Sequence, residues 1–330
     1  MTDDQRFGDF HYAPVVGTYT PKFSELLPHT SIAGLSLQSQ YLYGGFRAES
    51  GTVYVLERKF IGPMTGGLYL LHNGGGRMEL HEGSKRSAKG EMVRTIEPDF
   101  RRWITKGMLS GDHEEPIDLR IDDNAMTWEE GSLLSLSGPR PTLGGQFLSS
   151  MRDEPLAYAS QPYWLTGTIL GEQVEGPIFF DQVYFRHGSE WKEYPYYTDV
   201  QIVWNIFANK YADGTIEFGN ITKGRRRWGA GIVAEGNQAI AEANHVGAEF
   251  EVDADGYVTG ASYDLGEAGV WDFVGDPAQQ LSGFNKARWG GYRAQGGMTR
   301  RRGDTREVVT GWTWVEAFSD RMKEEELLRH

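Results

Sequence analysis

Residues 164–220 constrain the fold of this chain more than any other segment. They consist of short runs rich in β-branched and aromatic residues, and each run ends at a Gly, a Pro or an Asp-Gly pair. One run covers residues 175–186, the next covers 200–207, and a turn at Asp213-Gly214 leads into residues 215–218. This pattern is typical of antiparallel strands that are joined by tight turns.

The same plan extends along the rest of the chain. A hairpin pattern over residues 248–263 turns at Asp255-Gly256. The 43 glycines against 13 prolines supply the tight turns that many short strands require. Four earlier segments alternate apolar and polar residues and predict strands: residues 31–43, 52–60, 66–71 and 117–122. We therefore expect an all-β fold.

Helix is expected in few places. Residues 97–108 are compatible with either a short helix or an irregular strand. The tail at residues 319–329 combines strong helix formers with Ser319 as a candidate N-cap, so we expect a short C-terminal helix.

The length of 330 residues exceeds what one hydrophobic core usually supports, so two domains are expected. The richest Pro and Gly segment covers residues 137–145, and the chain after it has weak periodicity as far as Pro162. We place the boundary near residue 155, which gives domains at residues 1–155 and 156–330.

The composition excludes several classes of function. A net charge of −13 argues against a broad electrostatic surface for nucleic acid. The absence of Cys excludes disulfides, thiolate metal sites and a cysteine nucleophile. None of the eight His residues has the spacing of a metal-binding motif, so we expect neither a metal nor another cofactor.

The start of the chain lacks a signal-peptide pattern, and no apolar run is long enough to span a bilayer. We therefore expect a cytoplasmic protein without a membrane span. A homodimer is left open.

One polar cluster lies within the predicted strands, between three Phe residues at 179, 180 and 185. Strand alternation places Asp181 on one face, and Gln182, Tyr184 and Arg186 on the other. A carboxyl group enclosed by Phe rings has its pKa raised by desolvation, which suits proton transfer near neutral pH. The alternative interpretation is a buried structural ion pair between Asp181 and either Arg186 or another Arg.

After the expected boundary come a Thr-Gly-Thr strand, a Gly-hydrophobic-Asp strand that carries an Arg, a Trp-bearing strand and an Asp-Gly turn, and the chain closes with Gly311-Trp-Thr-Trp-Val-Glu316. This order resembles the hydroxyneurosporene synthase-like (carotenoid hydratase) superfamily. Asp181 and Arg186 match the family pattern, while Gln182 and Tyr184 stand where the family has His and Trp. Residues 40–43, before Gly44-Gly45, are similar to the family's aromatic opening strand.

The resemblance implies two consecutive lipocalin-like antiparallel β-barrels. It also implies a metal-free lyase or isomerase that acts on apolar molecules through hydration, dehydration or pericyclic chemistry. The cluster and the resemblance together give four catalytic candidates: Asp181, Tyr184, Arg186 and Glu316. Eight further side chains are candidates for binding an apolar or aromatic ligand: Tyr43, His72, Trp164, Gln182, Tyr197, Trp204, Trp289 and Trp314.

Three functions remain open. The first is a cofactor-independent enzyme, of the hydratase or dehydratase type or an isomerase, that acts on an apolar or aromatic small molecule. The second is a non-catalytic carrier of such a ligand, and the third is a carbohydrate-active β-sandwich enzyme. A closed apolar cavity with an ionisable cluster favours the first, the same cavity without that cluster favours the second, and an open aromatic groove with two facing carboxylates favours the third.

Overall fold

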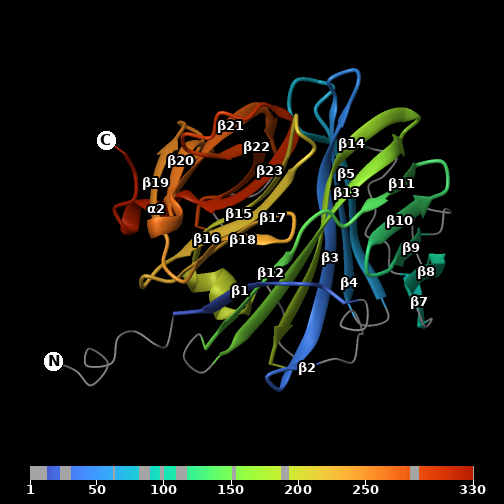
Figure 1. Ribbon diagram of the computed structural model, residues 1–330, viewed down its shortest axis with the longest axis horizontal. Helices are drawn as coiled ribbons and strands as arrows, with labels where there is room; N and C mark the ends of the chain where they lie inside the picture. The colour runs from blue at the N-terminus through green and yellow to red at the C-terminus, as the bar shows by residue number, and fades with distance from the viewer. Residues whose placement is uncertain are drawn as a thin grey trace.

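The protein is an all-β structure of two antiparallel sheets, as its turn-rich sequence predicts (Figure 1). The structure is a computed structural model. It describes residues 13–22, 31–61, 64–81, 90–96, 100–108, 117–150, 154–186, 193–282 and 290–329. In this part of the chain, no helix is long and apolar enough to cross a membrane.

The first sheet contains the strands up to Phe185. Its central path runs β13-β11-β10-β9-β8-β7-β5-β4-β3-β14, and β14 also pairs with β13, so this sheet closes on itself. Its described strands are β1 (Val15–Tyr19), β2 (Ser31–Ile32), β3 (Leu35–Ala48), β4 (Val53–Ile61), β5 (Met64–His72), β6 (Glu79–Leu80), β7 (Gly90–Ile96), β8 (Arg101–Met108), β9 (Ile117–Ile121), β10 (Ala125–Glu130), β11 (Leu134–Pro139), β12 (Gly144–Ser149), β13 (Leu156–Ile169) and β14 (Glu172–Phe185).

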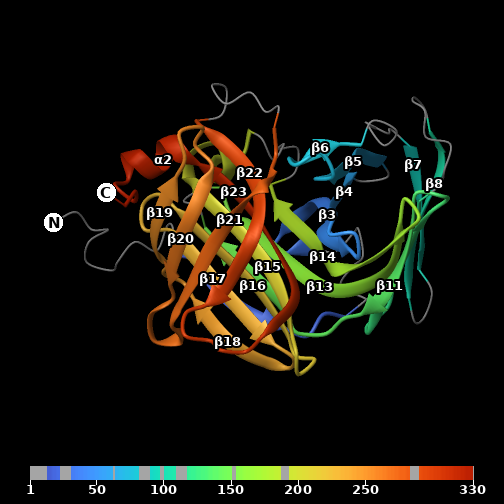
Figure 2. The same ribbon diagram turned by 90° about the horizontal axis from the view of Figure 1, so that it is seen from above.

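The second sheet follows in the order β18-β17-β16-β15-β23-β22-β21-β20-β19. Figure 1 shows it beside the first sheet, and Figure 2 shows from above how strongly both sheets curve. Its strands are β15 (Gln201–Tyr211), β16 (Ile216–Gly224), β17 (Gly229–Glu235), β18 (Gln238–Ala243), β19 (Gly247–Val252), β20 (Val258–Asp264), β21 (Val270–Gln280), β22 (Tyr292–Arg301) and β23 (Val308–Phe318). A π-helical turn, η4 (Tyr196–Val200), precedes β15, and a 3-10 turn, η5 (Gly266–Ala268), follows β20.

The predicted elements are found with small differences. The hairpin at 248–263 is β19 and β20, with Gly256 at a φ of 85° in the turn. Within residues 97–108 the described part is strand β8, not helix. The C-terminal helix is present as α2 (Ser319–Glu324), but Ser319 lies inside it and Phe318 takes the N-cap position without a side-chain cap.

The last strand of the first sheet ends at Phe185, and the first strand of the second sheet begins at Gln201. Strand β13 begins just after the expected boundary near residue 155, and it pairs with β12, which lies before that boundary. The division into units at residues 1–155 and 156–330 therefore stays a prediction about independent folding.

Strand alternation produces five clusters of buried apolar residues in the described chain, and the three largest position the site. On β3 and β4, Leu42 and Leu56 point into the first sheet, where they join a core that includes Trp128. The second sheet has its own interior core around Phe207 and Trp271. The opposite faces of the two sheets pack against each other through a third cluster: Val53, Val55, Phe179, Ile206, Ala208, Trp312 and Trp314 are among its members.

Gly45 on β3 shows how closely the sheets approach. A Cβ atom there would lie 2.3 Å from the indole of Trp312 on β23. Only a residue without a side chain leaves room for that ring.

The interior of the first sheet also contains a charged pair. Arg58 Nε donates to Glu130 Oε1 over 2.7 Å, and both side chains are almost fully buried. Trp128 Nε1 donates to the same carboxylate oxygen at 2.9 Å. This pair lies on the opposite face of β4 from the side chains that meet the second sheet.

Candidate active site between the two sheets

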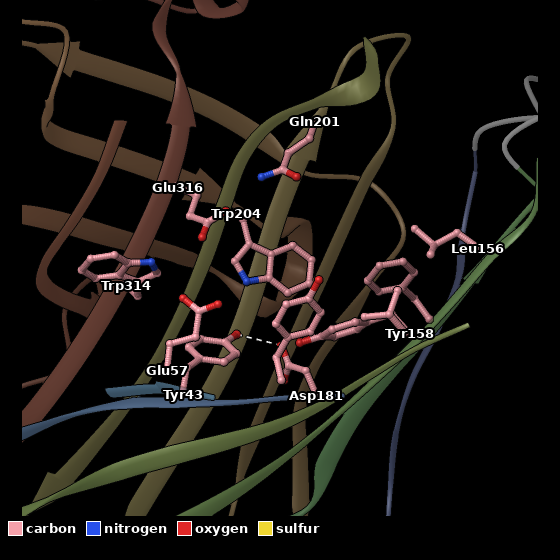
Figure 3. A pocket seen from close by; sticks show the side chains of 12 residues that line it. Tyr43, Glu57, Leu156, Tyr158, Asp181, Gln201, Trp204, Trp314 and Glu316 are labelled. Carbon is pink, nitrogen blue, oxygen red and sulfur yellow. Dashed lines mark hydrogen bonds between the residues drawn. The ribbon is translucent and has the colours of Figure 1, made fainter. Parts of the chain in front are cut away.

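A cavity of about 110 Å³ lies where the two sheets face each other (Figure 3). Its walls come from β3, β4, β12, β13 and β14 of the first sheet and from β15 and β23 of the second. The lining residues are Tyr41, Tyr43, Glu57, Phe147, Leu156, Tyr158, Asp181, Val183, Gln201, Trp204, Trp314 and Glu316.

The period of two along a strand explains which residues reach this cavity. On β14, Asp181 and Val183 line it, whereas Phe180 packs into the interior of the first sheet. On β23, Trp314 and Glu316 line it, whereas Val315 packs into the second sheet. The cavity is thus built from the faces of the two sheets that their own cores leave free.

Asp181 is held from the neighbouring strand. The Tyr43 hydroxyl donates a 2.8 Å hydrogen bond to Asp181 Oδ2, and Figure 3 shows this contact at the floor of the cavity. The indole of Trp204, on the second sheet, hydrogen bonds in turn with Tyr43. The other carboxyl oxygen, Asp181 Oδ1, is buried and has no hydrogen-bond partner in the described part of the chain.

The surroundings of Asp181 favour its protonated form. Burial raises the pKa of Asp181 to about 7, and the hydroxyls of Ser160, Tyr158 and Tyr43 limit this rise by lowering it. The negative charge of Glu316 raises it further. The carboxyl group can therefore both hold and release a proton near neutral pH.

Two more carboxyl groups share the cavity. Burial raises the pKa of Glu57 to about 7, and the charge of Glu316 adds to the rise, while Lys59 and Arg58 lower it. Burial also raises the pKa of Glu316, and hydrogen bonds from Tyr292 and Trp314 act in the opposite direction. Both Glu side chains keep some accessible surface because they face the cavity, although they lie deep between the sheets.

Aromatic rings form most of the remaining wall. The rings of Tyr158 and Trp204 meet edge to face with centroids 4.8 Å apart, and Phe147 stacks on Tyr158 at 5.1 Å. Trp314 stacks on Trp312 at 5.7 Å. Such contacts fix the rings in place and keep the carboxyl groups in an apolar environment.

The structure brings five of the predicted site residues together. Asp181 and Glu316, both predicted as catalytic, lie in one cavity with the three predicted ligand-binding residues Tyr43, Trp204 and Trp314. These five come from four strands on two sheets.

The other predicted residues lie elsewhere. Tyr184 packs against Leu35 and Ala157, and Gln182 is buried on the face of β14 opposite to Asp181. Three more predicted ligand-binding residues do not line the cavity, and Trp289 is outside the described residues. Of those three, His72 lies near Tyr54, Trp164 donates to Glu175 and Tyr197 packs on Phe318.

Arg186 does not form the ion pair with Asp181 that was the alternative interpretation. Its side chain is 65% exposed and pairs with Glu154. The strand turns Arg186 to the face opposite to Asp181, so the two groups are close in sequence but separated by the sheet.

The cavity also contains residues that the sequence interpretation missed, chiefly Glu57, Tyr41, Tyr158 and Gln201. Glu57 had a recognisable signal, because it follows Val53 and Val55 at alternate positions on one face of a predicted strand. A carboxylate that follows two apolar residues on one strand face, before Lys59, is a signal of a special environment. Gln201 and Tyr158 had no comparable signal, since their place depends on how the two sheets meet.

In the part of the chain that the structure describes, no three His, Asp or Glu side chains are arranged to hold a metal ion. The three carboxyl groups are spread around the cavity instead of converging on one point.

Comparison of this chain with known proteins finds solved structures that are similar to it. No family model and no curated protein matches the chain. A putative AttH from Nitrosomonas europaea is 11% identical, with a TM-score of 0.45, and the match covers 87% of this chain and 94% of that one. Kievitone hydratase from Nectria haematococca is 12% identical, with a TM-score of 0.39 and coverage of 94% and 99%.

Proposed function

We propose that this protein is a cofactor-independent enzyme that uses acid/base catalysis on an aromatic or largely apolar small molecule bound between the two sheets. The reaction class that we favour is lyase chemistry, the addition or removal of water, with isomerisation as the second choice. The observation that carries the proposal is Asp181, a buried carboxyl group that lines an aromatic cavity, has one oxygen without a partner among the described residues, and has its pKa raised to about 7.

The three carboxyl groups provide both halves of acid/base catalysis. Glu316 raises the pKa of both Asp181 and Glu57, so the loss of one proton from the cluster disfavours the loss of the next. At neutral pH the cluster then holds protonated and ionised members together. In this proposal Asp181 gives a proton to the substrate, and Glu57 or Glu316 accepts one from the water or carbon that reacts.

The remaining lining residues would hold the substrate. Trp204, Tyr158 and Phe147 offer ring faces and edges to an apolar body. Tyr43 keeps Asp181 in one orientation, which leaves Oδ1 free for the ligand. Positioned groups of this kind each contribute roughly 10²–10⁴-fold to a rate.

The carrier hypothesis shares the cavity but gives no role to three carboxyl groups in it. Burying an ionisable group costs free energy, and a carrier of an apolar ligand would gain nothing from that cost. The third hypothesis, a carbohydrate-active enzyme, calls for an open groove, whereas this site is a small space between packed sheets.

The experiment is a search for turnover in water labelled with heavy oxygen. The purified protein is incubated with a panel of neutral and cationic aromatic molecules that carry an alkene or a tertiary alcohol, and the products are analysed by mass spectrometry. We expect at least one compound to gain or exchange labelled water, or to isomerise, with the wild-type protein and not with Asp181→Asn. A panel that is bound but never converted would support the carrier instead.

A further inference from the structure

The charge distribution around the cavity is one-sided. Asp181, Glu57 and Glu316 enter it from β14, β4 and β23, and the described residues that line it include no Lys, Arg or His. A positive charge lies close to one lining residue, since the Nζ of Lys59 is 5.0 Å from the centre of the Tyr41 ring. Arg58, the next residue, is on the other face of β4 and is paired with Glu130.

This arrangement disfavours an anionic ligand. Above neutral pH, where the acids are ionised, a carboxylate or phosphate group would meet like charges and no positively charged lining residue, and like charges in a poorly solvated space repel strongly. It also matches a single metal ion poorly, since no three acidic side chains in the described chain share one coordination point.

The walls are suited to positive charge instead. Tyr41, Tyr43, Tyr158, Trp204 and Trp314 present π-systems around the three acids. Rings of Trp and Tyr attract an ammonium group through their negative faces, and a set of them around a cation is a common way to bind quaternary nitrogen. The Lys59 ammonium beside Tyr41 shows that a ring of this wall already has such a neighbour.

We propose that the cavity recognises a ligand with a positive charge on nitrogen, namely a protonated or quaternary alkylamine that carries an aromatic ring. The charged nitrogen is placed among Asp181, Glu57 and Glu316, where the buried Oδ1 of Asp181 lacks a partner. Figure 3 shows Gln201 on the side of the cavity away from Asp181; it is 1% exposed, and its Nε2 has no partner among the described residues. An oxygen on the ligand would accept a hydrogen bond from it.

The size of the cavity limits the ligand. Its volume of about 110 Å³ is close to that of a cavity that takes one benzene ring, about 150 Å³. The proposal therefore concerns a compact amine with one aromatic ring. It rests on the same cavity as the proposed function and narrows the substrate class of that enzyme.

The test compares three probes of nearly equal shape by isothermal titration calorimetry: benzylammonium, benzyl alcohol and benzoate. We expect benzylammonium to bind at least about tenfold more tightly than benzyl alcohol, and benzoate not to bind. A neutral probe that binds as well as the cation, measurable binding of benzoate, or binding of none of the three would each overturn the proposal.

The acids provide the second arm. Asp181→Asn, Glu57→Gln and Glu316→Gln should each weaken benzylammonium binding while leaving benzyl alcohol binding unchanged. Glu129→Gln makes the same chemical change at an exposed position on β10 and serves as the control. Equal loss for both probes in the three cavity variants would point to altered packing and contradict the charge preference.

The third arm is the pH dependence of benzylammonium binding below about pH 8, where this alkylamine keeps its positive charge. The groups that face the acids are the hydroxyls of Tyr43, Tyr158 and Ser160 at Asp181, Lys59 at Glu57, and Tyr292 at Glu316. A cation favours the ionised acids, so affinity should rise with pH through neutrality by up to about tenfold per pH unit for each proton released. Constant affinity over this range would overturn the proposal.

These outcomes are independent of the proposed reaction. If the protein converts a substrate in labelled water but shows no preference for cationic probes, the proposed enzymatic function stands and the proposed cationic ligand is rejected. If the protein prefers cationic probes but converts no substrate, the proposed cationic ligand stands and the proposed enzymatic function is rejected.

Discussion

The Tyr43 hydroxyl donates a 2.8 Å hydrogen bond to Oδ2 of Asp181, from the strand next to it in the first sheet. This contact occupies one oxygen of the carboxyl group, whereas the other oxygen is buried and has no hydrogen-bond partner among the described residues. From this geometry we predict which substitutions at the site change the activity and which change the stability of the fold.

Asp181→Asn should abolish most of the activity without unfolding the protein. The amide keeps the shape of the side chain but cannot transfer a proton, so turnover should fall by roughly 10²–10⁴-fold. Because Asp181 has no ion-pair partner, the melting temperature should change little. Arg186→Gln is the control, since it removes an exposed ion pair that contributes at most about 1 kcal/mol. A variant that melts far below the wild type, and loses activity only with its fold, would reject the catalytic role.

Tyr43→Phe should move the pH profile upward. The Tyr43 hydrogen bond lowers the pKa of Asp181, so its removal lets that pKa rise further above its ordinary range. If protonated Asp181 is the active form, activity then persists to higher pH than in the wild type. Tyr54→Phe is a matched control, because the Tyr54 hydroxyl interacts with Glu172 outside the cavity. A pH–rate profile that stays in place, or moves to lower pH, would contradict this relationship.

Stability should fall as the pH rises through neutrality. The folded-state pKa values of Asp181 and Glu57 are about 7, above the ordinary values of 3.8 and 4.5. The folded protein therefore keeps protons that the unfolded chain has already released. The stabilisation is complete below about pH 4 and is lost by about pH 7 to 8. Melting temperatures from about pH 5 to 8 should decline, and less steeply in Glu57→Gln, whose side chain does not titrate. A decline of equal slope in that variant would count against the pKa shift of Glu57.

Arg58→Met should destabilise the first sheet without reaching the cavity. It leaves the buried carboxyl group of Glu130 without the opposite charge of Arg58, which should cost about 3–5 kcal/mol. The double variant Arg58→Met with Glu130→Leu removes both charges and should recover much of this loss, as denaturant unfolding would show. If the double variant is no more stable than Arg58→Met alone, the side chains of Arg58 and Glu130 stabilise the fold through more than the attraction of their charges.

The sequence predicted the local structure well because alternation and turn residues act over short distances. The hairpin at residues 248–263 and strand β4 both follow directly from apolar spacing and Asp-Gly or Gly signals. Asp181 was found for the same reason, as a polar residue enclosed by Phe residues on a predicted strand.

The complete set of cavity residues could not be predicted from the sequence, because it depends on how the two sheets pack against each other. Tyr184 and Arg186 are neighbours of Asp181 in sequence but lie away from the cavity, whereas Tyr158 comes from β13, the strand paired with β14. Gln201 and Trp204 come from the other sheet altogether. The packing of β14 opposite β15 and β23 decides which polar residues meet, and no local pattern encodes it.

The contact between Gly45 and Trp312 sets the spacing of the two sheets at a place outside the residues that line the cavity. Trp312 stacks on Trp314, and Trp314 is part of the cavity wall. A methyl group at position 45 would push the first indole, and through it the second, so the gap between the sheets would widen or the wall would tilt. The range of molecules that this pocket admits is therefore adjustable from outside it, and selection or engineering can retune substrate size while every acid stays in place.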